Sequence, residues 1–111
     1  MVMNQVNFRT LDLNLLRIFD EVMAERSLTR AAQKMALTQP AVSNAMRRLR
    51  DRLGEDLMRR DGQGLTPTPR ALALWPLVRT ALSQLEQGLN PGEFEPAQAD
   101  ATFVLAMADA T

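Results

Sequence analysis

Two short helical segments joined by a very short connection are the feature that most restricts what this sequence can fold into. Ser27 precedes an amphipathic segment over residues 28–35, and Thr38 precedes a second one over residues 39–53. Ser and Thr are favoured N-cap residues because their hydroxyl oxygens accept a hydrogen bond from an N–H group of the first turn. Only Ala36 and Leu37 separate the first segment from the N-cap candidate Thr38. The spacing therefore predicts two helices that cross closely, as in a helix-turn-helix.

The residues around this connection suit a close crossing. Ala32 is small where the helices are expected to meet, Leu37 is an apolar candidate anchor in the turn, and Val42 is an anchor on the second helix. Ala36 occupies a turn position that is usually glycine, and a left-handed backbone there costs alanine about 1 kcal/mol. The sequence predicts a tight turn that is formed at a modest loss of stability.

Other periodic segments predict a helix on each side of this pair and a hairpin after it. The segment 12–25 begins with the N-cap candidate Asp12. Gly54 follows the segment 39–53, and it should end that helix because glycine adopts a left-handed backbone easily. Residues 57–67 predict two short strands around a Gly-rich turn, and a longer helix, kinked at Pro76, should follow Thr68. The expected core positions of the first three helices are Leu15, Ile18, Phe19, Val22, Met23, Leu28, Ala31, Ala32, Met35, Val42, Ala45, Met46, Leu49 and Leu53.

Composition removes most enzyme chemistry. The 111 residues include no Cys and no His, which excludes zinc fingers, thiol nucleophiles, imidazole bases and His-ligated metals. An enzyme fragment that uses paired carboxylates is the weakest hypothesis, since Glu55, Asp56 and Asp61 border a basic hairpin. No apolar run of about 18 residues and no apolar leader occurs. We expect no enzyme activity, no cofactor, no membrane association and a cytoplasmic location.

The net charge of zero conceals two unlike regions. All thirteen basic residues lie in the segment from Arg9 to Arg79. That segment also contains eight acidic residues, so its net charge is +5. Residues 80–111 contain five acidic residues and no basic one, so they carry −5. Residues 26–60 alone carry +6. A basic segment followed by an acidic one keeps nucleic acid among the possible partners.

The polar side of residues 39–53 is a candidate base-reading surface. With the apolar stripe facing inwards, the opposite side presents Gln39, Pro40, Ser43, Asn44, Arg47 and Arg50. Gln39 and Asn44 can pair with adenine, Ser43 can donate or accept, and Arg47 can bind guanine or phosphate. The N-terminus of the helix also attracts a phosphate. The alternative interpretation is an ordinary solvated face.

The hairpin adds two arginines, Arg59 and Arg60, beside Gly62 and Gly64. A basic Gly-rich hairpin next to a helix-turn-helix is typical of a wing that lies along phosphates or enters a minor groove. In the competing interpretation Arg60 pairs with a nearby aspartate and only stabilises the hairpin. The pattern favours a wing, and Arg59 more than Arg60.

The motifs together resemble the N-terminal region of LysR-type transcriptional regulators, over about residues 11–108. The segments that carry the resemblance are 27–32, 37–44, 49–54, 57–60 and 65–67. The resemblance implies a winged helix-turn-helix, a dimerising linker helix and a following effector-binding domain that senses a small molecule. Residues 103–108 look like the first strand of that domain, which is otherwise missing. Met58 replaces a usual Phe and Ala36 a common Gly, and both bear on packing and the turn.

Carried over position by position, the DNA-contacting helix of the family adds Ala41, and its wing arginine falls on Arg60. Thr29 and Arg30, in the first turn of the preceding helix, are candidate backbone contacts. The full set of expected contacts to double-stranded DNA is Ser27, Thr29, Arg30, Thr38, Gln39, Pro40, Ala41, Ser43, Asn44, Arg47, Arg48, Arg50, Arg59 and Arg60.

An apolar seam in the last helix predicts a homodimer. Its residues alternate by three and four positions and are Trp75, Val78, Leu82, Leu85 and Leu89. The seam could instead pack on its own domain. We expect a mainly α winged helix-turn-helix with a small β-hairpin wing over residues 11–67, after a tail over residues 1–10. A linker and dimerisation helix over 68–90 and a hinge with the truncated effector domain over 91–111 follow. The hypothesis is a bacterial regulator that binds an inverted repeat; the alternative is a protein-interaction module with the helix-turn-helix as scaffold.

Overall fold

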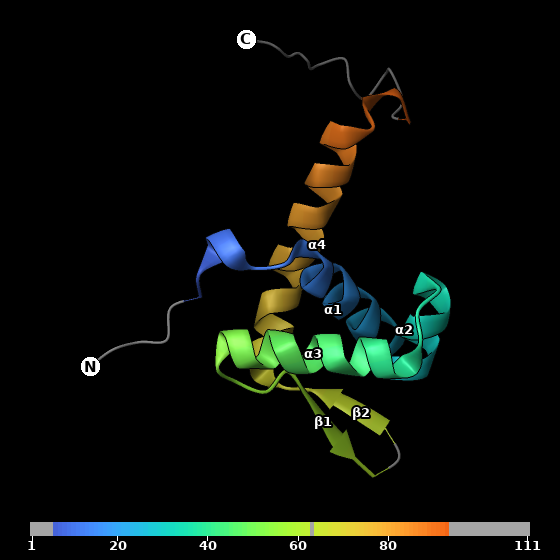
Figure 1. Ribbon diagram of the computed structural model, residues 1–111, viewed down its shortest axis with the longest axis vertical. Coiled ribbons are helices and arrows are strands. Elements are labelled where there is room, and N and C mark those ends of the chain that lie inside the picture. Colours follow the sequence, from blue (N-terminus) through green and yellow to red (C-terminus); the bar gives the residue numbers. More distant parts are fainter. Residues whose placement is uncertain (1–5, 63, 94–111) are drawn as a thin grey trace, which may run out of the picture. The chain divides into compact units, whose positions relative to one another are not determined.

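The computed structural model describes residues 6–62 and 64–93, and Figure 1 shows its elements. The chain divides into two units at Arg79. The expected helices and the hairpin all form, which confirms a mainly helical fold with a two-stranded wing. The segment proposed as a first strand, residues 103–108, lies outside the described residues. The elements are η1 (Phe8–Thr10), α1 (Leu13–Glu25), α2 (Leu28–Met35), α3 (Gln39–Leu53), β1 (Met58–Asp61), β2 (Gly64–Pro67), α4 (Pro69–Leu89) and η2 (Pro91–Glu93).

Side-chain caps explain where the helices begin. Each expected N-cap residue accepts a hydrogen bond from a backbone N–H two or three residues later, so four orphan donors are satisfied. Thr68 also donates its hydroxyl hydrogen to the carbonyl oxygen of Asp56, at 2.8 Å, which ties the start of α4 to the segment before β1. The capping distances are 2.9 Å at Asp12, 3.1 Å at Ser27, 3.2 Å at Thr38 and 3.3 Å at Thr68.

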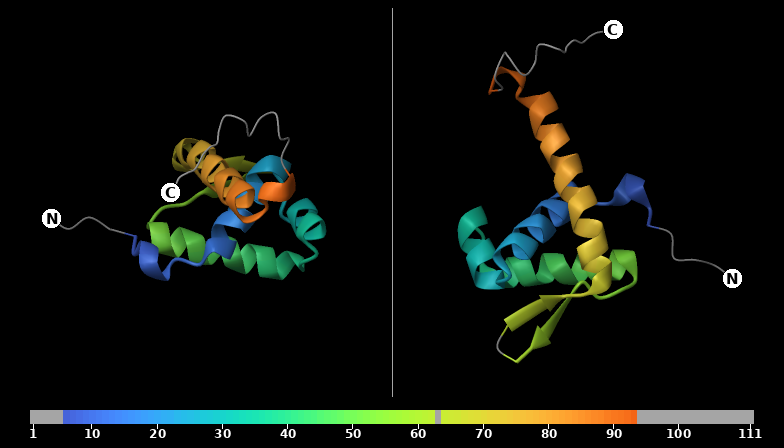
Figure 2. Two further views of the ribbon diagram at one scale, coloured as in Figure 1. Left: turned by 90° about the horizontal axis from the view of Figure 1, so that it is seen from above. Right: turned by 180° about the vertical axis from the view of Figure 1, so that it is seen from behind.

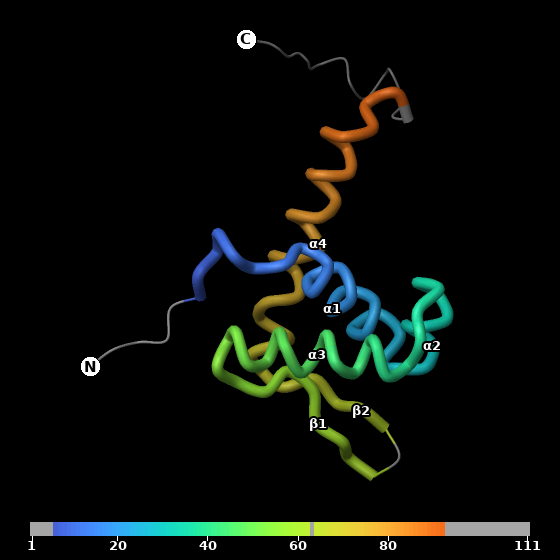
Figure 3. The backbone as a smooth tube through the Cα atoms, in the orientation of Figure 1, coloured from blue at the N-terminus to red at the C-terminus, as the bar shows by residue number. Residues whose placement is uncertain are grey.

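Helices α1, α2 and α3 pack against one another, and Figure 3 traces their backbones. Their buried side chains form the core of the first unit. Its largest fully buried side chains are Phe19, Met23, Leu49, Val22 and Val42. Four expected core positions are only half-buried: Leu28, Met35, Met46 and Leu53. Leu28 and Met46 face the hairpin across a hollow, which explains their partial exposure. The helical periodicity therefore identified the core but overstated its width.

Backbone hydrogen bonds, and not a buried side chain, close the turn between α2 and α3. Ala36 is left-handed (φ 57°, ψ 42°), as the sequence suggested. Leu37 N–H donates to the carbonyl oxygen of Ala32 at 2.8 Å, and Ala36 N–H donates to that of Gln33 at 3.3 Å. This is a Schellman motif. The expectation that Leu37 anchors the turn is wrong, because its side chain is 40% exposed.

The turn from α1 to α2 also uses a left-handed residue that is not glycine. Arg26 has φ 54° and donates its N–H to the carbonyl oxygen of Val22 at 2.7 Å. This conformation could not be predicted from the sequence, because arginine does not favour it. As a result, α2 is bounded at both ends by left-handed residues other than glycine.

The wing is a two-stranded antiparallel hairpin that extends below α3 in Figure 1 and in the right-hand view of Figure 2. Its register places Arg60 opposite Leu65 and Arg59 opposite Thr66. Alternation along a strand puts these two pairs on different faces of the hairpin. Gly62 adopts φ 65°, a conformation that glycine takes without strain.

The N-terminal segment is more than a tail. Residues 8–10 form η1, and Arg52 of α3 donates hydrogen bonds to Thr10 Oγ1 at 3.1 and 2.8 Å from its two terminal nitrogens. Arg52 therefore fastens η1 to the C-terminal end of α3. Nothing in the composition of residues 1–10 indicated this contact.

The first part of α4, up to Arg79, belongs to the first unit. Ala71 and Val78 are buried, and Trp75 is half-buried. The helix continues through Pro76 as far as Leu89. Two of the five seam residues, Trp75 and Val78, are thus engaged within their own unit.

The second unit contains the rest of α4 and η2 among its described residues. Leu82 is half-buried, whereas Leu85 is 47% and Leu89 78% exposed. The helix ends at Leu89, followed by Asn90 and η2, as the Asn-Pro-Gly sequence predicts. Within residues 6–62 and 64–93, no helix has the length and hydropathy that a membrane span requires.

Candidate nucleic-acid interface

Helix α3 turns one polar side away from the core. Val42, Ala45 and Leu49 are buried. On the opposite side Gln39 and Ser43 are half-buried, and the exposed residues are Pro40, Asn44, Arg47 and Arg50. The helical repeat separates the expected contacts into an outer ridge and a flank beside the wing. Pro40, Asn44 and Arg47 form the ridge, and Gln39, Ser43 and Arg50 form the flank.

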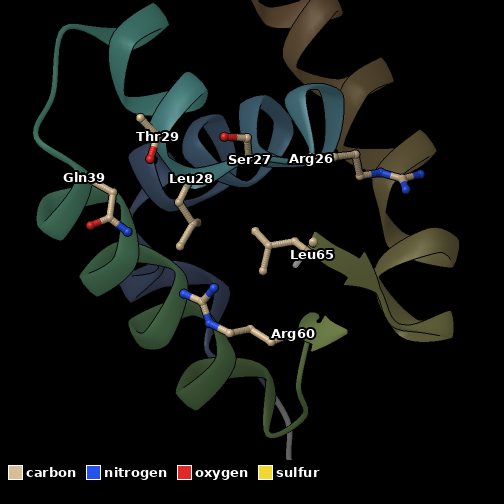
Figure 4. A pocket seen from close by; sticks show the side chains of 8 residues that line it. Arg26, Ser27, Leu28, Thr29, Gln39, Arg60 and Leu65 are labelled. Atoms are coloured by element: carbon tan, nitrogen blue, oxygen red, sulfur yellow. The ribbon is translucent and has the colours of Figure 1, made fainter. Parts of the chain in front are cut away.

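A hollow of about 220 Å³ separates the N-terminal ends of α2 and α3 from the wing. Figure 4 shows Thr29 and Gln39 on the helix side, with the guanidinium of Arg60 pointing from the wing toward α3. Arg26 also lines the hollow, although its guanidinium points away from Arg60 in the same view. Donors from three separate elements thus border a single opening.

A second hollow of about 290 Å³ continues along the same flank of α3. Ser43, Arg47 and Arg50 line it from the helix, and Arg60 lines it from the wing. Arg59 lines neither hollow, because it is on the other face of the hairpin. The structure therefore brings Arg60, and not Arg59, to α3. The preference for Arg59 as the wing contact to DNA stays a prediction.

The wing arginines have no acidic partner among the described residues. The ion pairs there join Lys34 to Glu25, Arg50 to Asp51, Arg70 to Glu55 and Arg79 to Asp20. The interpretation in which Arg60 only pairs with a neighbouring aspartate therefore finds no support. The guanidinium of Arg60 is left able to bind an anion in the hollow.

Two internal pairs on α3 affect how it can meet a ligand. Arg47 donates to Asn44 Oδ1 at 2.6 Å. Bidentate pairing with adenine uses both the oxygen and the amide group of an asparagine. Arg47 therefore shares the oxygen on which that contact depends, and it holds the Asn44 side chain in place. Arg50 is paired with Asp51 at 3.0 Å. This carboxylate places a negative charge at the end of the flank.

The capping hydroxyls keep one hydrogen-bonding function free. Ser27 and Thr38 use their oxygens to accept backbone N–H groups. Each hydroxyl hydrogen remains able to donate to a phosphate oxygen. Thr29 and Arg30 are exposed in the first turn of α2, where the helix N-terminus favours negative charge.

Arg48 is separated from the other expected contacts. It lines a different hollow with Thr10, Arg52 and Asp51, on the far flank of α3. Ala41 is exposed on the same side of the outer ridge. Sequence reasoning did not identify Arg26, Gly64 or Leu65 as lining residues, since their place depends on how the wing folds against α2.

These elements define the class of the protein: a winged helix-turn-helix whose α3 presents donors and acceptors beside a basic wing. Comparison with known proteins identifies the family. The family model described as "Bacterial regulatory helix-turn-helix protein, lysR family" matches residues 13–72. Because this match covers more than half of the chain, the protein belongs to the LysR family of transcriptional regulators. These are regulators and not enzymes, as the composition indicated.

Curated relatives agree with this assignment. The chain is 43% identical over 103 residues to the HTH-type transcriptional regulator LeuO of Escherichia coli (strain K12), covering 93% of this chain and 33% of LeuO. It is 45% identical over 105 residues to nodulation protein D 2 of Rhizobium tropici, covering 94% of this chain and 33% of that protein. The chain spans about a third of the length of these relatives.

Solved structures show the same fold. A probable transcriptional regulator from Pseudomonas aeruginosa matches with a TM-score of 0.73 and 40% identity, over 82% of this chain and 31% of that one. The BenM DNA-binding domain, solved in complex with benA site 1 DNA, matches with a TM-score of 0.69 and 27% identity, over 83% of this chain and all of that one.

Proposed function

We propose that this chain binds a specific DNA operator by placing α3 in the major groove. The observation that carries the proposal is the exposed ridge of α3 beside two hollows that Arg60 borders from the wing. A major groove of about 12 Å admits one helix. The BenM domain of the same fold was solved with DNA, which supports this mode of binding.

Contacts to bases and to phosphates come from different residues in this arrangement. Asn44 and Arg47 on the outer ridge, together with Gln39, are positioned to reach base edges. Ser27, Thr29 and Thr38, at the N-terminal ends of α2 and α3, bind phosphates. Arg60 approaches the same DNA phosphates from the wing. Arg48 and Arg59 lie apart, and we assign them only long-range attraction for the duplex.

The operator should be an inverted repeat that is bound by a dimer. Leu85 and Leu89 are exposed on α4 although apolar, and with Leu82 they continue the seam beyond the buried Val78. Such a stripe is the usual surface for pairing with a second helix. A two-fold dimer presents two recognition helices to half-sites one helical turn, or a multiple of it, apart.

The full-length regulator is expected to carry an effector-binding domain, since the chain covers about a third of its relatives. A small-molecule effector would act through that domain, and DNA as the partner implies a cytoplasmic location. The alternative, an interaction module with the helix-turn-helix as scaffold, is not favoured by the family assignment.

Selection of bound duplexes from a random pool tests the proposal. We expect an enriched inverted repeat. Binding to it should weaken by roughly 10³-fold or more when salt rises from about 50 to 200 mM, because arginines release counterions from the phosphates. Recovery of no enriched sequence, or a salt-independent affinity, would contradict the proposed function.

A further inference from the structure

A cluster of three side chains joins α1 to α4 away from the DNA-facing surface. Trp75 Nε1 donates a hydrogen bond to Asp20 Oδ1 at 2.8 Å. Arg79 Nε lies 3.1 Å from the same oxygen. The guanidinium carbon of Arg79 lies 5.3 Å from the centre of the Trp75 ring, within the range of a cation–π contact. Each member of the cluster therefore contacts the other two.

Asp20 depends on this cluster more than its partners do. Its side chain is 18% exposed, whereas that of Arg79 is 56% exposed. A carboxylate that is largely removed from water requires hydrogen bonds or an opposite charge. Among the described residues, both side-chain partners of Asp20 come from α4. The solvation of this acid on α1 is thereby coupled to the position of residues 75–79 of α4.

Pro76 lies between the two residues that Asp20 holds. Proline has no N–H, so it cannot donate to the carbonyl oxygen of Leu72, and the helix is weaker at that turn. Trp75 precedes Pro76 and Arg79 follows it by less than one turn. Asp20 therefore contacts α4 on both sides of Pro76, where the helix lacks one backbone hydrogen bond.

We propose that Asp20 is a positioning residue that braces α4 across Pro76 and makes DNA affinity depend on the spacing of the operator half-sites. The inference rests on the proposed function, because it requires dimers joined through residues 82–89 of the same helix. In such a dimer each recognition helix reaches its half-site through α4. A helix that bends freely at Pro76 tolerates several spacings, whereas a braced helix favours one.

The test uses the whole chain and three variants. Asp20→Asn retains an acceptor for Trp75 but loses the charge that pairs with Arg79. Arg79→Met removes the other charge from an exposed position, so the fold is retained. Glu21→Gln, adjacent to Asp20 on α1, is the matched control. The probes are the inverted repeat recovered from the random pool, the same repeat with one or two base pairs inserted at its centre, and a single half-site.

We expect the ratio of Kd values, inserted over natural spacing, to shrink by roughly 2- to 30-fold in Asp20→Asn and Arg79→Met. Affinity for the single half-site should stay within about twofold of the wild type. Trp75 is the only tryptophan, and its quenching by acrylamide should rise in both variants. Glu21→Gln should match the wild type in every measurement.

Three results would overturn the brace while leaving DNA binding intact. In the first, the wild-type protein binds repeats of every spacing with the same Kd. In the second, the ratio of Kd values is unchanged in both variants. In the third, the variants lose as much affinity for the single half-site as for the repeat. The last would assign Asp20 to the stability of the unit alone. Failure to recover any duplex with the wild-type chain would overturn the proposed function, and this inference with it.

Discussion

Helices α3 and α4 carry similar apolar stripes but use their exposed sides in opposite ways. Helix α3 buries Val42, Ala45 and Leu49 in its own unit and presents a polar ridge. Helix α4 buries Ala71 and Val78, yet its stripe continues to Leu89, which is 78% exposed. The two exposed sides differ in chemistry, and each suits the partner that we propose for it. The polar side of α3 suits the edges of DNA bases, and the apolar side of α4 suits another helix.

The largest expected effect separates the two parts of α4. Val78→Asp places an unpaired charge at a buried position and should lower the free energy of unfolding by about 3 kcal/mol. Leu85→Asp, on the same stripe, should leave it nearly unchanged when measured on dilute protein. Urea titrations followed by circular dichroism compare the two. Equal destabilisation would mean that the division of α4 at Arg79 does not describe its packing.

Leu82→Glu tests whether the outer part of the stripe pairs with a second copy. We expect monomers in sedimentation equilibrium, because a charge at the seam is desolvated by pairing. Affinity for the inverted repeat should fall by roughly 10²–10⁴-fold through loss of bivalence, with half-site affinity retained. A variant that sediments as the wild type does would remove the seam from the dimer.

Asn44→Ala tests the outer ridge of α3. The substitution should weaken binding to the selected operator by about 1–3 kcal/mol, because it removes contacts to base edges. Binding to random DNA should stay nearly unchanged. Fluorescence anisotropy with both duplexes measures the difference. Similar losses on both duplexes would show that Asn44 contacts the backbone and does not read bases.

A smaller effect distinguishes the two wing arginines. Arg60→Ala should weaken all duplexes and reduce the slope of log Kd against log salt by about one, as expected for one lost phosphate contact. Arg59→Ala, on the other face of the hairpin, is the control and should change this slope less. If Arg59→Ala changed the slope more than Arg60→Ala, Arg59 would be the main phosphate contact of the wing, as the sequence alone suggested.

Much of the fold could be predicted because local signals mark its boundaries. Side-chain caps at Asp12, Ser27, Thr38 and Thr68 are short-range chemistry, and each begins a helix where the sequence indicates. Register of the wing against α3 is a tertiary property. Sequence reasoning could not tell which wing arginine faces α3, and the structure shows that it is Arg60.

The wrong expectation at Leu37 and the divided seam have a related cause. An apolar residue in a tight turn looks like an anchor, but backbone hydrogen bonds to Ala32 and Gln33 already close this turn. Likewise, a three-and-four repeat runs through Trp75 and Leu89 without showing where intramolecular packing ends. Periodicity reveals which side of a helix is apolar, and only the structure shows what covers it.

The left-handed backbone of Ala36 lowers the free energy of unfolding of this protein. Ala36 adopts φ 57°, so Ala36→Gly removes a steric penalty of about 1 kcal/mol, partly offset by the greater freedom of glycine in the unfolded chain. Proteins generally persist just above the stability that their function requires. The net gain is a fraction of about 1 kcal/mol, so this change would offset the cost of about one mildly destabilising surface substitution elsewhere in the domain.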